Sequence, residues 1–315
     1  MALPERMTSW DVAVVGEIYA DHVFTGFARW PGPGEEVLAD GYVRELGGGC
    51  VNTACGLSRL GRRVRLVGLI GDADVDWFEG RLGEFGVGMG GIRLGAESTG
   101  ITVSVSTRED RSFFTWPGAN RGLADLLGEP VVLADLASAR HVHFAMPLPR
   151  QRAAEILPRL REAGCTSSLD VGYSPDWLTD PRNLDTCREV DLFLPNRTEA
   201  AVLCGEDGPD AYARWAWAEG LPRAVLKLGA EGALVIDADG VTRVVAPRVD
   251  ALDTTGAGDA FDAGLIDALL DDAPFGRCVE RACVCGALCT TAPGALRALP
   301  DSLQLRTLRE QTYGS

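Results

Sequence analysis

The segment Asp253-Thr-Thr-Gly-Ala-Gly-Asp259 places two carboxylates around a glycine-rich turn. Residues 260–270 after it predict a helix, so the turn would lie at a helix N-terminus. Free backbone N–H groups and the positive end of the helix dipole favour an anion there, and glycines let the backbone approach it closely. Gly256, Ala257 and Gly258 are therefore candidates for holding a phosphoryl group. Asp259 is the candidate base for a hydroxyl group that attacks it.

A structural role is the alternative for each carboxylate. Asp253 would then cap a helix, and the glycines would only form a turn. Asp170 ends an expected strand, where ligands gather but where carboxylates also cap turns, so both interpretations of it stay open. The sequence contains no Walker A pattern, G-x-x-x-x-G-K-[ST], which excludes a P-loop kinase.

Apolar runs alternate with helix-like stretches along the chain. Expected strands lie at 12–15, 64–70, 141–145, 166–170, 192–194 and 224–228, and expected helices include 52–60, 151–163 and 198–203. Such alternation predicts βαβ units and a mainly parallel sheet. Ligands of such sheets bind at the carboxyl ends of the strands.

Two segments break this rhythm. Residues 21–46 are rich in Gly, Pro and aromatic residues, with strand-like pieces and no helix pattern. Residues 100–116 read as a β-hairpin around a charged turn at 108–111. Together they predict a small antiparallel sheet that projects from the main one. Its role is either a lid over an active site or an extension of the sheet edge.

The composition restricts the partners and the compartment. The 315-residue chain has 30 Lys and Arg against 45 Asp and Glu, a net charge of −15, and its pI is near 4.7. Nucleic-acid binding needs clustered cations, so this partner is not expected. No apolar run approaches the roughly 20 residues that cross a bilayer, and residues 1–11 lack a signal-peptide pattern. We therefore expect a cytoplasmic protein without a membrane partner.

The cysteines and histidines do not form a metal pattern. Nine cysteines occur without paired Cys-x-x-Cys spacing, so we expect them to be small buried hydrophobic residues. His141 and His143 share one side of an expected strand, and the only other histidine is His22. We expect these two side chains to pack in the core.

Five segments, in order along the chain, resemble the motifs of the ribokinase (PfkB) family of carbohydrate and nucleoside kinases. The resemblance covers nearly the whole chain. The segments are Gly16-Glu-Ile-Tyr-Ala-Asp21, Gly47-Gly-Gly-Cys-Val-Asn-Thr-Ala54, Pro195-Asn-Arg-Thr-Glu199, Leu226-Lys-Leu-Gly229 followed by Gly232, and Asp253-Thr-Thr-Gly-Ala-Gly-Asp259.

The resemblance implies a role for each segment. Asp259 would be the general base, with Gly256, Ala257 and Gly258 as the anion hole. The resemblance implies that the substrate is bound by Asp21, Gly48, Gly49 and Asn52. It implies that ATP is bound by Asn196, Lys227, Gly229, Gly232 and Thr254. Glu199 would bind Mg²⁺ through water or phosphate, and Asp253 and Thr255 would bind a monovalent cation such as K⁺.

The resemblance also implies an α/β, ribokinase-like fold. We expect one kinase domain over residues 1–315, with a mainly parallel central sheet flanked by helices and a small β-sheet lid. The lid would be formed by segments of approximately 21–46 and 100–117. In related proteins lids often pair across a dimer, so a homodimer through the lid is a further expectation.

Departures from the family pattern concern the substrate more than the chemistry. Ribokinases carry an asparagine where this chain has Tyr19, a lysine where it has Gly49, and a glutamate that is missing near Met146. Ribose is therefore not the expected acceptor, and few basic residues in these segments argue against a phosphorylated sugar. A sugar kinase, a nucleoside kinase and a non-catalytic sugar- or nucleotide-binding protein remain the alternatives.

Overall fold

A large, mainly parallel sheet forms the centre of the molecule. The computed structural model describes residues 9–107 and 111–314. Within them the spatial order is β13 (Gly240–Val244), β12 (Ala233–Asp237), β11 (Ala224–Lys227), β10 (Leu192–Phe193), β9 (Thr166–Asp170), β8 (Ala139–Ala145), β1 (Trp10–Gly16), β4 (Val64–Ile70) and β5 (Ile92–Leu94). Neighbours from β11 to β5 are parallel, whereas β12 and β13 are antiparallel. The expected central sheet is confirmed.

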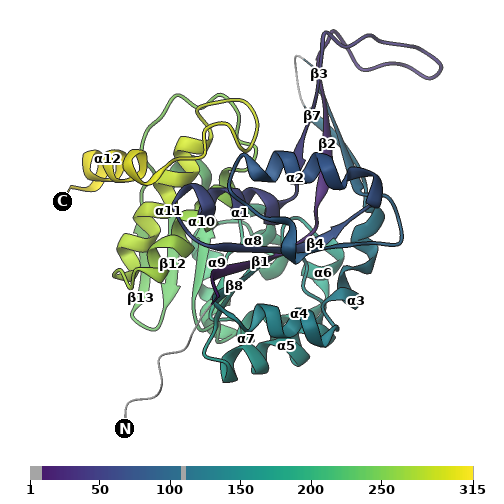
Figure 1. Ribbon diagram of the computed structural model, residues 1–315. Helices are drawn as coiled ribbons and strands as arrows, with labels where there is room; N and C mark the ends of the chain where they lie inside the picture. Colours follow the sequence, from purple (N-terminus) through teal and green to yellow (C-terminus); the bar gives the residue numbers. More distant parts are fainter. Residues whose placement is uncertain (1–8, 108–110, 315) are drawn as a thin grey trace.

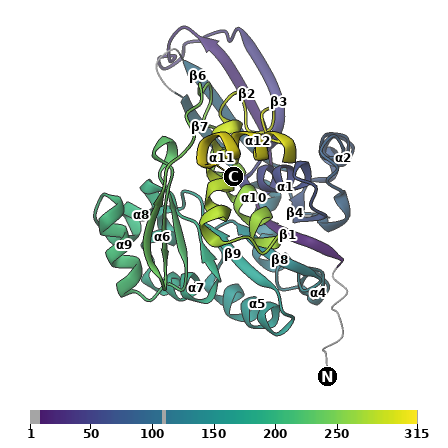
Figure 2. The same ribbon diagram turned by 90° about the vertical axis from the view of Figure 1, so that its left-hand side faces the viewer.

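Helices cover both faces of this sheet (Figures 1 and 2). One face carries α1 (Gly49–Arg59), α2 (Val75–Gly83), α10 (Ala257–Leu270) and α11 (Phe275–Cys289), with α12 (Ser302–Tyr313) against α11. The other carries α3 (Leu123–Leu126), α4 (Pro130–Leu136), α5 (Arg150–Glu162), α6 (Pro175–Thr179), α7 (Leu184–Glu189), α8 (Arg197–Cys204) and α9 (Pro209–Ala218).

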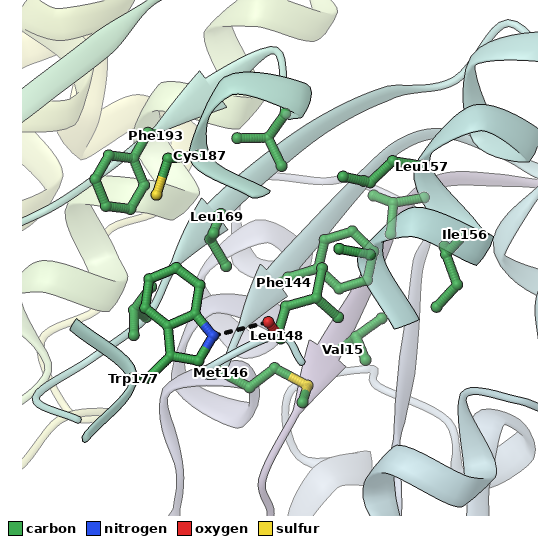
Figure 3. Close-up of a cluster of buried hydrophobic side chains, with 14 of the residues drawn as sticks. Val15, Phe144, Met146, Leu148, Ile156, Leu157, Leu169, Trp177, Cys187 and Phe193 are labelled. Atoms are coloured by element: carbon green, nitrogen blue, oxygen red, sulfur yellow. Dashed lines mark hydrogen bonds between the residues drawn. The ribbon is translucent and has the colours of Figure 1, made fainter. Parts of the chain in front are cut away.

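The alternation of side chains along β1 shows how one strand serves both cores. Val12 and Val14 are buried against the α1 and α10 side, and Ala13 and Val15 against the α3 to α9 side. A strand buried on both faces reads as a continuous apolar run, which is why it was recognisable in the sequence. Figure 3 shows the core on the α3 to α9 side of the sheet, where the Trp177 indole N–H donates to the Leu148 carbonyl oxygen at 2.8 Å.

A second sheet projects from the main body (Figure 1). Its order is β3 (Gly41–Gly47), β2 (Tyr19–Phe27), β6 (Gly100–Thr107) and β7 (Arg111–Trp116). The outer pairs are antiparallel, but β2 and β6 are parallel, so the expectation of an antiparallel sheet was wrong for this central pair. The two segments come from distant parts of the chain, and local patterns do not determine their relative direction. The expected turn at 108–111 lies largely outside the described residues.

Two local expectations near the C-terminal half also need correction. The strand β11 is followed by a short 3-10 turn, Gly229–Glu231, and then by the antiparallel β12, not by a helix. The helix α10 begins at Ala257, three residues before the expected start at Ala260. Its first turn contains Gly258, whose low helix propensity concealed the true start.

The cysteines and the two histidines of β8, for which we expect no metal-binding role, lie mostly in the interior. Eight of the nine cysteines are buried, and Cys204 is half-buried. His141 and His143 are buried, and both imidazoles contact the Ser168 hydroxyl, at 2.7 and 2.8 Å. Burial lowers the pKa of His143 to about 3 and that of His141 to about 4, so both rings are neutral.

Among the described residues, no helix combines the length and the apolar character that crossing a membrane requires.

Asn120 fixes the point where the chain passes from the main sheet to the small sheet. Its side-chain oxygen accepts a hydrogen bond from the Ile18 N–H at 3.0 Å, and its amide nitrogen donates to the Ile18 carbonyl at 2.9 Å. Ile18 lies between β1 and β2, and Asn120 lies in the 3-10 turn Gly118–Gly122 that follows β7. One buried amide therefore joins the entry to the small sheet and its exit.

We expect Asn120→Ala to lower the free energy of unfolding by roughly 2–4 kcal/mol, because it leaves both polar backbone groups of Ile18 buried and unpaired. Urea denaturation at pH 7 measures the change. Asn183 is a matched control, since its buried amide donates one bond, to the Trp177 carbonyl at 2.9 Å. Equal losses for Asn120→Ala and Asn183→Ala would contradict the double anchor.

Candidate active site

Asp259 lies in the first turn of α10, where the sequence placed it. Gly256 is the N-cap, with φ of 74°, a backbone conformation that favours glycine. A Cβ atom at Gly256 would also crowd Ala295. The first N–H groups of a helix have no intrahelical acceptors, so the start of α10 offers donors to an anion beside Asp259.

A second helix N-terminus meets the same carboxylate. Gly49 begins α1, and a Cβ atom added there would lie 3.0 Å from the Asp259 Oδ1 atom. One turn further, the Asn52 side-chain amide donates to Asp259 Oδ2 at 2.7 Å. The structure thus brings together Gly49, Asn52 and Asp259, three of the predicted site residues.

The Asp259 carboxyl group has a raised pKa. Burial raises it to about 6, and the negative charge of Asp170 adds to the effect, while the hydrogen bond from Asn52 acts in the opposite direction. Near neutral pH this group is therefore largely ionised and close to its pKa. A carboxylate of this kind can accept a proton and release it again.

Asp259 lines a pocket of about 410 Å³, here called the Asp259 pocket. Its other lining residues are Glu17, Tyr19, Gly48, Gly49, Ala145, Met146, Pro147, Asp170, Val171, Gly172, Tyr173 and Ser174. The predicted residues Gly48 and Gly49 are among them. Glu17 and Tyr173 were not predicted as site residues; Glu17 stood inside a quoted motif, but nothing in the sequence distinguished Tyr173.

Asp21 lies on β2 of the small sheet and is not among the lining residues. Its carboxylate packs against Gly47, where a Cβ atom would overlap it, and accepts a hydrogen bond from Thr102. Burial raises the pKa of Asp21 to about 6, and Glu45 on the neighbouring strand adds to the rise.

A second pocket, of about 460 Å³, lies on the other side of the α10 N-terminus. We call it the Lys227 pocket. Predicted residues lining it are Lys227, Gly229, Gly232, Thr254, Ala257 and Gly258; the remainder are Ala230, Ala246, Pro247, Arg248, Val249, Ala251, Phe261, Cys283, Gly286, Ala287 and Thr290. Most of these side chains are small or apolar, and such a wall suits a flat heterocycle. Asn196 is not among them.

Comparison with known proteins identifies the family. A model described as pfkB family carbohydrate kinase matches residues 10–302. The chain belongs to this family. It is 32% identical to the aminoimidazole riboside kinase of Salmonella typhimurium, over 84% of this chain and 88% of the relative. It is 28% identical to the 2-dehydro-3-deoxygluconokinase of Bacillus subtilis, over 84% and 86%.

The fold agrees with solved structures of ribokinases. The Arabidopsis thaliana ribokinase complexed with ribose and ATP superposes with a TM-score of 0.85 at 24% identity, covering 96% of this chain and 99% of that one. The expected family and the ribokinase-like fold are therefore confirmed, and the chain is a sugar or nucleoside kinase of the PfkB family.

In this PfkB kinase the Asn-x-x-Glu motif forms the N-terminus of α8. Asn196 is the N-cap, its side-chain oxygen accepts from the Glu199 N–H at 3.0 Å, and Glu199 accepts from the Asn196 N–H at 2.9 Å. This reciprocal arrangement is a capping box. Burial, together with the charge of Asp170, raises the pKa of Glu199 to about 7.

A buried ion pair joins the two pockets of the PfkB kinase. Lys227 Nζ lies 2.5 Å from Asp170 Oδ2 and 3.3 Å from Asp262 Oδ2. Asp170 lines the Asp259 pocket, and Lys227 lines the other. The ammonium also lies beside the anion-hole candidate Gly258, 3.6 Å from where its Cβ atom would be. Of the two interpretations of Asp170, the structure supports a place in the site.

Burial and charge act in opposite directions on this ion pair. Burial would raise the pKa of Asp170, but the Lys227 charge outweighs it and lowers that pKa to about 2. For Asp262 burial dominates and raises the pKa far above its usual range, and its carboxyl group is hydrogen-bonded to Asp170. The two acidic groups also keep the Lys227 ammonium charged despite its burial.

Asp253 joins two loops of the kinase and is not the helix N-cap. Its Oδ1 atom accepts from the Thr255 N–H at 3.0 Å and from the Thr255 hydroxyl at 2.7 Å. Its Oδ2 atom accepts from the Gly294 N–H at 2.9 Å, in the loop after α11. The alternative that Asp253 caps a helix was therefore wrong, because Gly256 is the N-cap of α10.

Another hollow of the kinase lies away from these pockets. It has a volume of about 930 Å³ and lies between α5 and α7. Arg150 and Arg188 in its wall are both ion-paired with Asp185, and Arg182 with Asp180. Its charges satisfy one another at the surface, so it offers no chemistry comparable to that around Asp259.

We expect Lys227→Met to lower the free energy of unfolding at pH 7 by about 3–5 kcal/mol, because the Asp170 carboxylate would stay buried without its cation. Urea denaturation measures this loss. The double variant Asp170→Asn/Lys227→Met removes both charges and should recover most of it.

Arg197→Met is the control for this series, since Arg197 forms an exposed pair with Glu231 and its removal should change the urea midpoint little. If the double variant were as unstable as Lys227→Met, the loss would arise from packing and not from an uncompensated charge.

Proposed function

We propose that this PfkB kinase transfers the γ-phosphoryl group of ATP to a hydroxyl group of a sugar or sugar-like molecule in the Asp259 pocket. Asp259 would be the general base. The observation that carries the proposal is the position of the first turn of α10: Asp259 faces one pocket, while Ala257 and Gly258 face the other. A phosphoryl group at this turn would lie between donor and acceptor, as in-line transfer requires.

The Lys227 pocket would take the nucleotide. Its small and apolar walls suit the base, and Gly256, Ala257 and Gly258 would hold the transferred group through backbone N–H groups. Lys227 would supply a fixed positive charge beside them. The Arabidopsis ribokinase was solved with ATP, which supports this donor.

Mg²⁺ would be held near Glu199, through water or phosphate oxygens, and would shield the phosphate charge. The Glu199 carboxylate fits this role because it is fixed by Asn196 and lies close enough to Asp170 for the two charges to interact. A monovalent cation such as K⁺ would bind in the loop before α10. Asp253 and Thr255 would hold this loop in shape, and its backbone carbonyl oxygens would be further ligands of the ion.

The acceptor would be held between α1, the carboxyl end of β1 and the small sheet, which would act as a lid. Gly48, Gly49 and Asn52 come from the α1 side, and Tyr19 and Asp21 from β2. The Asn52 side-chain oxygen is buried and has no partner among the described residues, so it is a candidate acceptor for a substrate hydroxyl.

A nucleoside acceptor is the second candidate. Tyr19 and Tyr173 both line the Asp259 pocket, and aromatic rings of this kind can contact a heterocyclic base. The relative named aminoimidazole riboside kinase is consistent with such an acceptor. Measurement of ADP production with MgATP across a panel of sugars and nucleosides would separate the two. A failure of every acceptor would favour the non-catalytic binding protein.

With the best acceptor, we expect Asp259→Asn to lower kcat by about 10²–10⁴-fold, the range for loss of a general base. The amide keeps the size of the carboxyl group and can still contact Asn52, so the fold should persist. A coupled assay of ADP production measures the rate, and turnover within a few-fold of wild type would refute the assignment.

The pH dependence provides an independent check of the same base. Since the pKa of Asp259 is about 6, wild-type kcat/KM should rise about tenfold per pH unit below 6 and level off above it. A profile that is flat from pH 5 to 8 would count against Asp259.

The requirement for a monovalent cation can be tested in the same assay by replacing K⁺ with tetramethylammonium.

We also propose a homodimer formed through the small sheet. Tyr42, Phe113 and Phe114 are each more than half exposed there, at 55%, 58% and 56%. These side chains lie on the two edge strands of the sheet, and exposed aromatic surface at a sheet edge can mark an interaction surface. Light scattering should give a dimer that Phe113→Ser/Phe114→Ser converts to monomers, and a monomeric wild type at 100 µM would contradict the proposal.

A further inference from the structure

The charged side chains that line the Asp259 pocket are all acidic. Glu17, Asp170 and Asp259 contribute carboxylates, and the other lining residues are uncharged. No Lys, Arg or His occurs among the lining residues of this pocket within the part of the chain that the structure describes. An acceptor bound here would therefore meet a negative potential on more than one side.

One nearby cation offsets part of this charge. Lys227 lies behind Asp170, in the wall of the neighbouring pocket, at 2.5 Å from that carboxylate, and its charge lowers the pKa of Asp170. Lys227 also acts on Asp259, which accepts a hydrogen bond from Asn52. Glu17 forms no ion pair among the described residues, so its carboxylate lines the pocket without a cationic partner.

Glu17 is held firmly at the edge of the pocket. Its carboxylate accepts a hydrogen bond from the Tyr19 hydroxyl at 2.8 Å. Its carbonyl oxygen accepts a bond from the Cys50 thiol at 3.2 Å. The same oxygen leaves room only for glycine at residue 48, since a Cβ atom on Gly48 would overlap it. The hydrogen bond from Tyr19 thus holds the Glu17 carboxylate at the edge of the pocket.

We propose that Glu17 is a specificity-determining residue that restricts the acceptor to uncharged or cationic polyhydroxyl compounds. Hydroxyl or amino groups of the acceptor would donate hydrogen bonds to its carboxylate, whereas acceptors with a carboxylate or phosphate group would be repelled. Repulsion of the wrong ligand is as effective a source of specificity as attraction of the right one. This inference rests on the proposed kinase function and names the substrate class for it.

The test compares neutral probes, fructose, ribose and aminoimidazole riboside, with the anionic probe 2-dehydro-3-deoxygluconate. We expect the best neutral probe to exceed the anionic one in kcat/KM by at least 100-fold in the wild type. Glu17→Gln keeps the side-chain volume and an acceptor for Tyr19 but removes the charge, so this ratio should fall at least tenfold. Glu206→Gln, at an exposed carboxylate that lines neither pocket, should leave it unchanged.

An anionic probe that matches or exceeds every neutral one in the wild type would overturn the inference, as would an unchanged ratio in Glu17→Gln. Failure of the kinase proposal would look different, because no probe of either class would yield ADP. Titration calorimetry with the same probes would then decide the charge preference: tighter binding of a neutral probe supports it, and tighter binding of the anion overturns it.

Discussion

The start of α1 and the start of α10 converge on the half-buried carboxylate of Asp259, and close helix packing keeps them there. Gly56 lets α1 approach α10 so closely that a Cβ atom would lie 2.9 Å from the Ala263 Cβ atom. On its other side, Gly264 brings α10 equally close to α11, at Cys285. Asp259 is thereby presented to solvent-accessible space at a point where two helix dipoles reinforce each other.

The second constraint is the balance of charge in the interior. Lys227, Asp170 and Asp262 meet where water is largely excluded, and an unbalanced charge there would be strongly unfavourable. The arrangement resolves this with the ion pair of Lys227 and Asp170 and with a strongly raised pKa at Asp262. Because the pair lies in the wall between the two pockets, the same contact that stabilises the core also fixes the electrostatic environment of each pocket.

Local features of the structure were predictable from the sequence, and long-range ones were not. The strand Val64–Ile70 could be read because burial on both faces demands a continuous apolar run. The contact between Asp170 and Lys227 could not, because 57 residues separate them and no local pattern records it. The parallel pairing of β2 with β6 was missed for the same reason. Glu17 stood within a predicted motif, yet only the surrounding pocket shows that its charge lacks a counterpart.

The anchor at Ile18 also bears on how the small sheet is attached. The small sheet joins the main body at four places, near residues 17, 48, 97 and 117, and Asn120 ties the first to the last. The anchor therefore fixes the small sheet to the body at the junction between Glu17 and Tyr19. The hydrogen bond from Tyr19 to Glu17 crosses the same junction, from a residue of the sheet to one of the body.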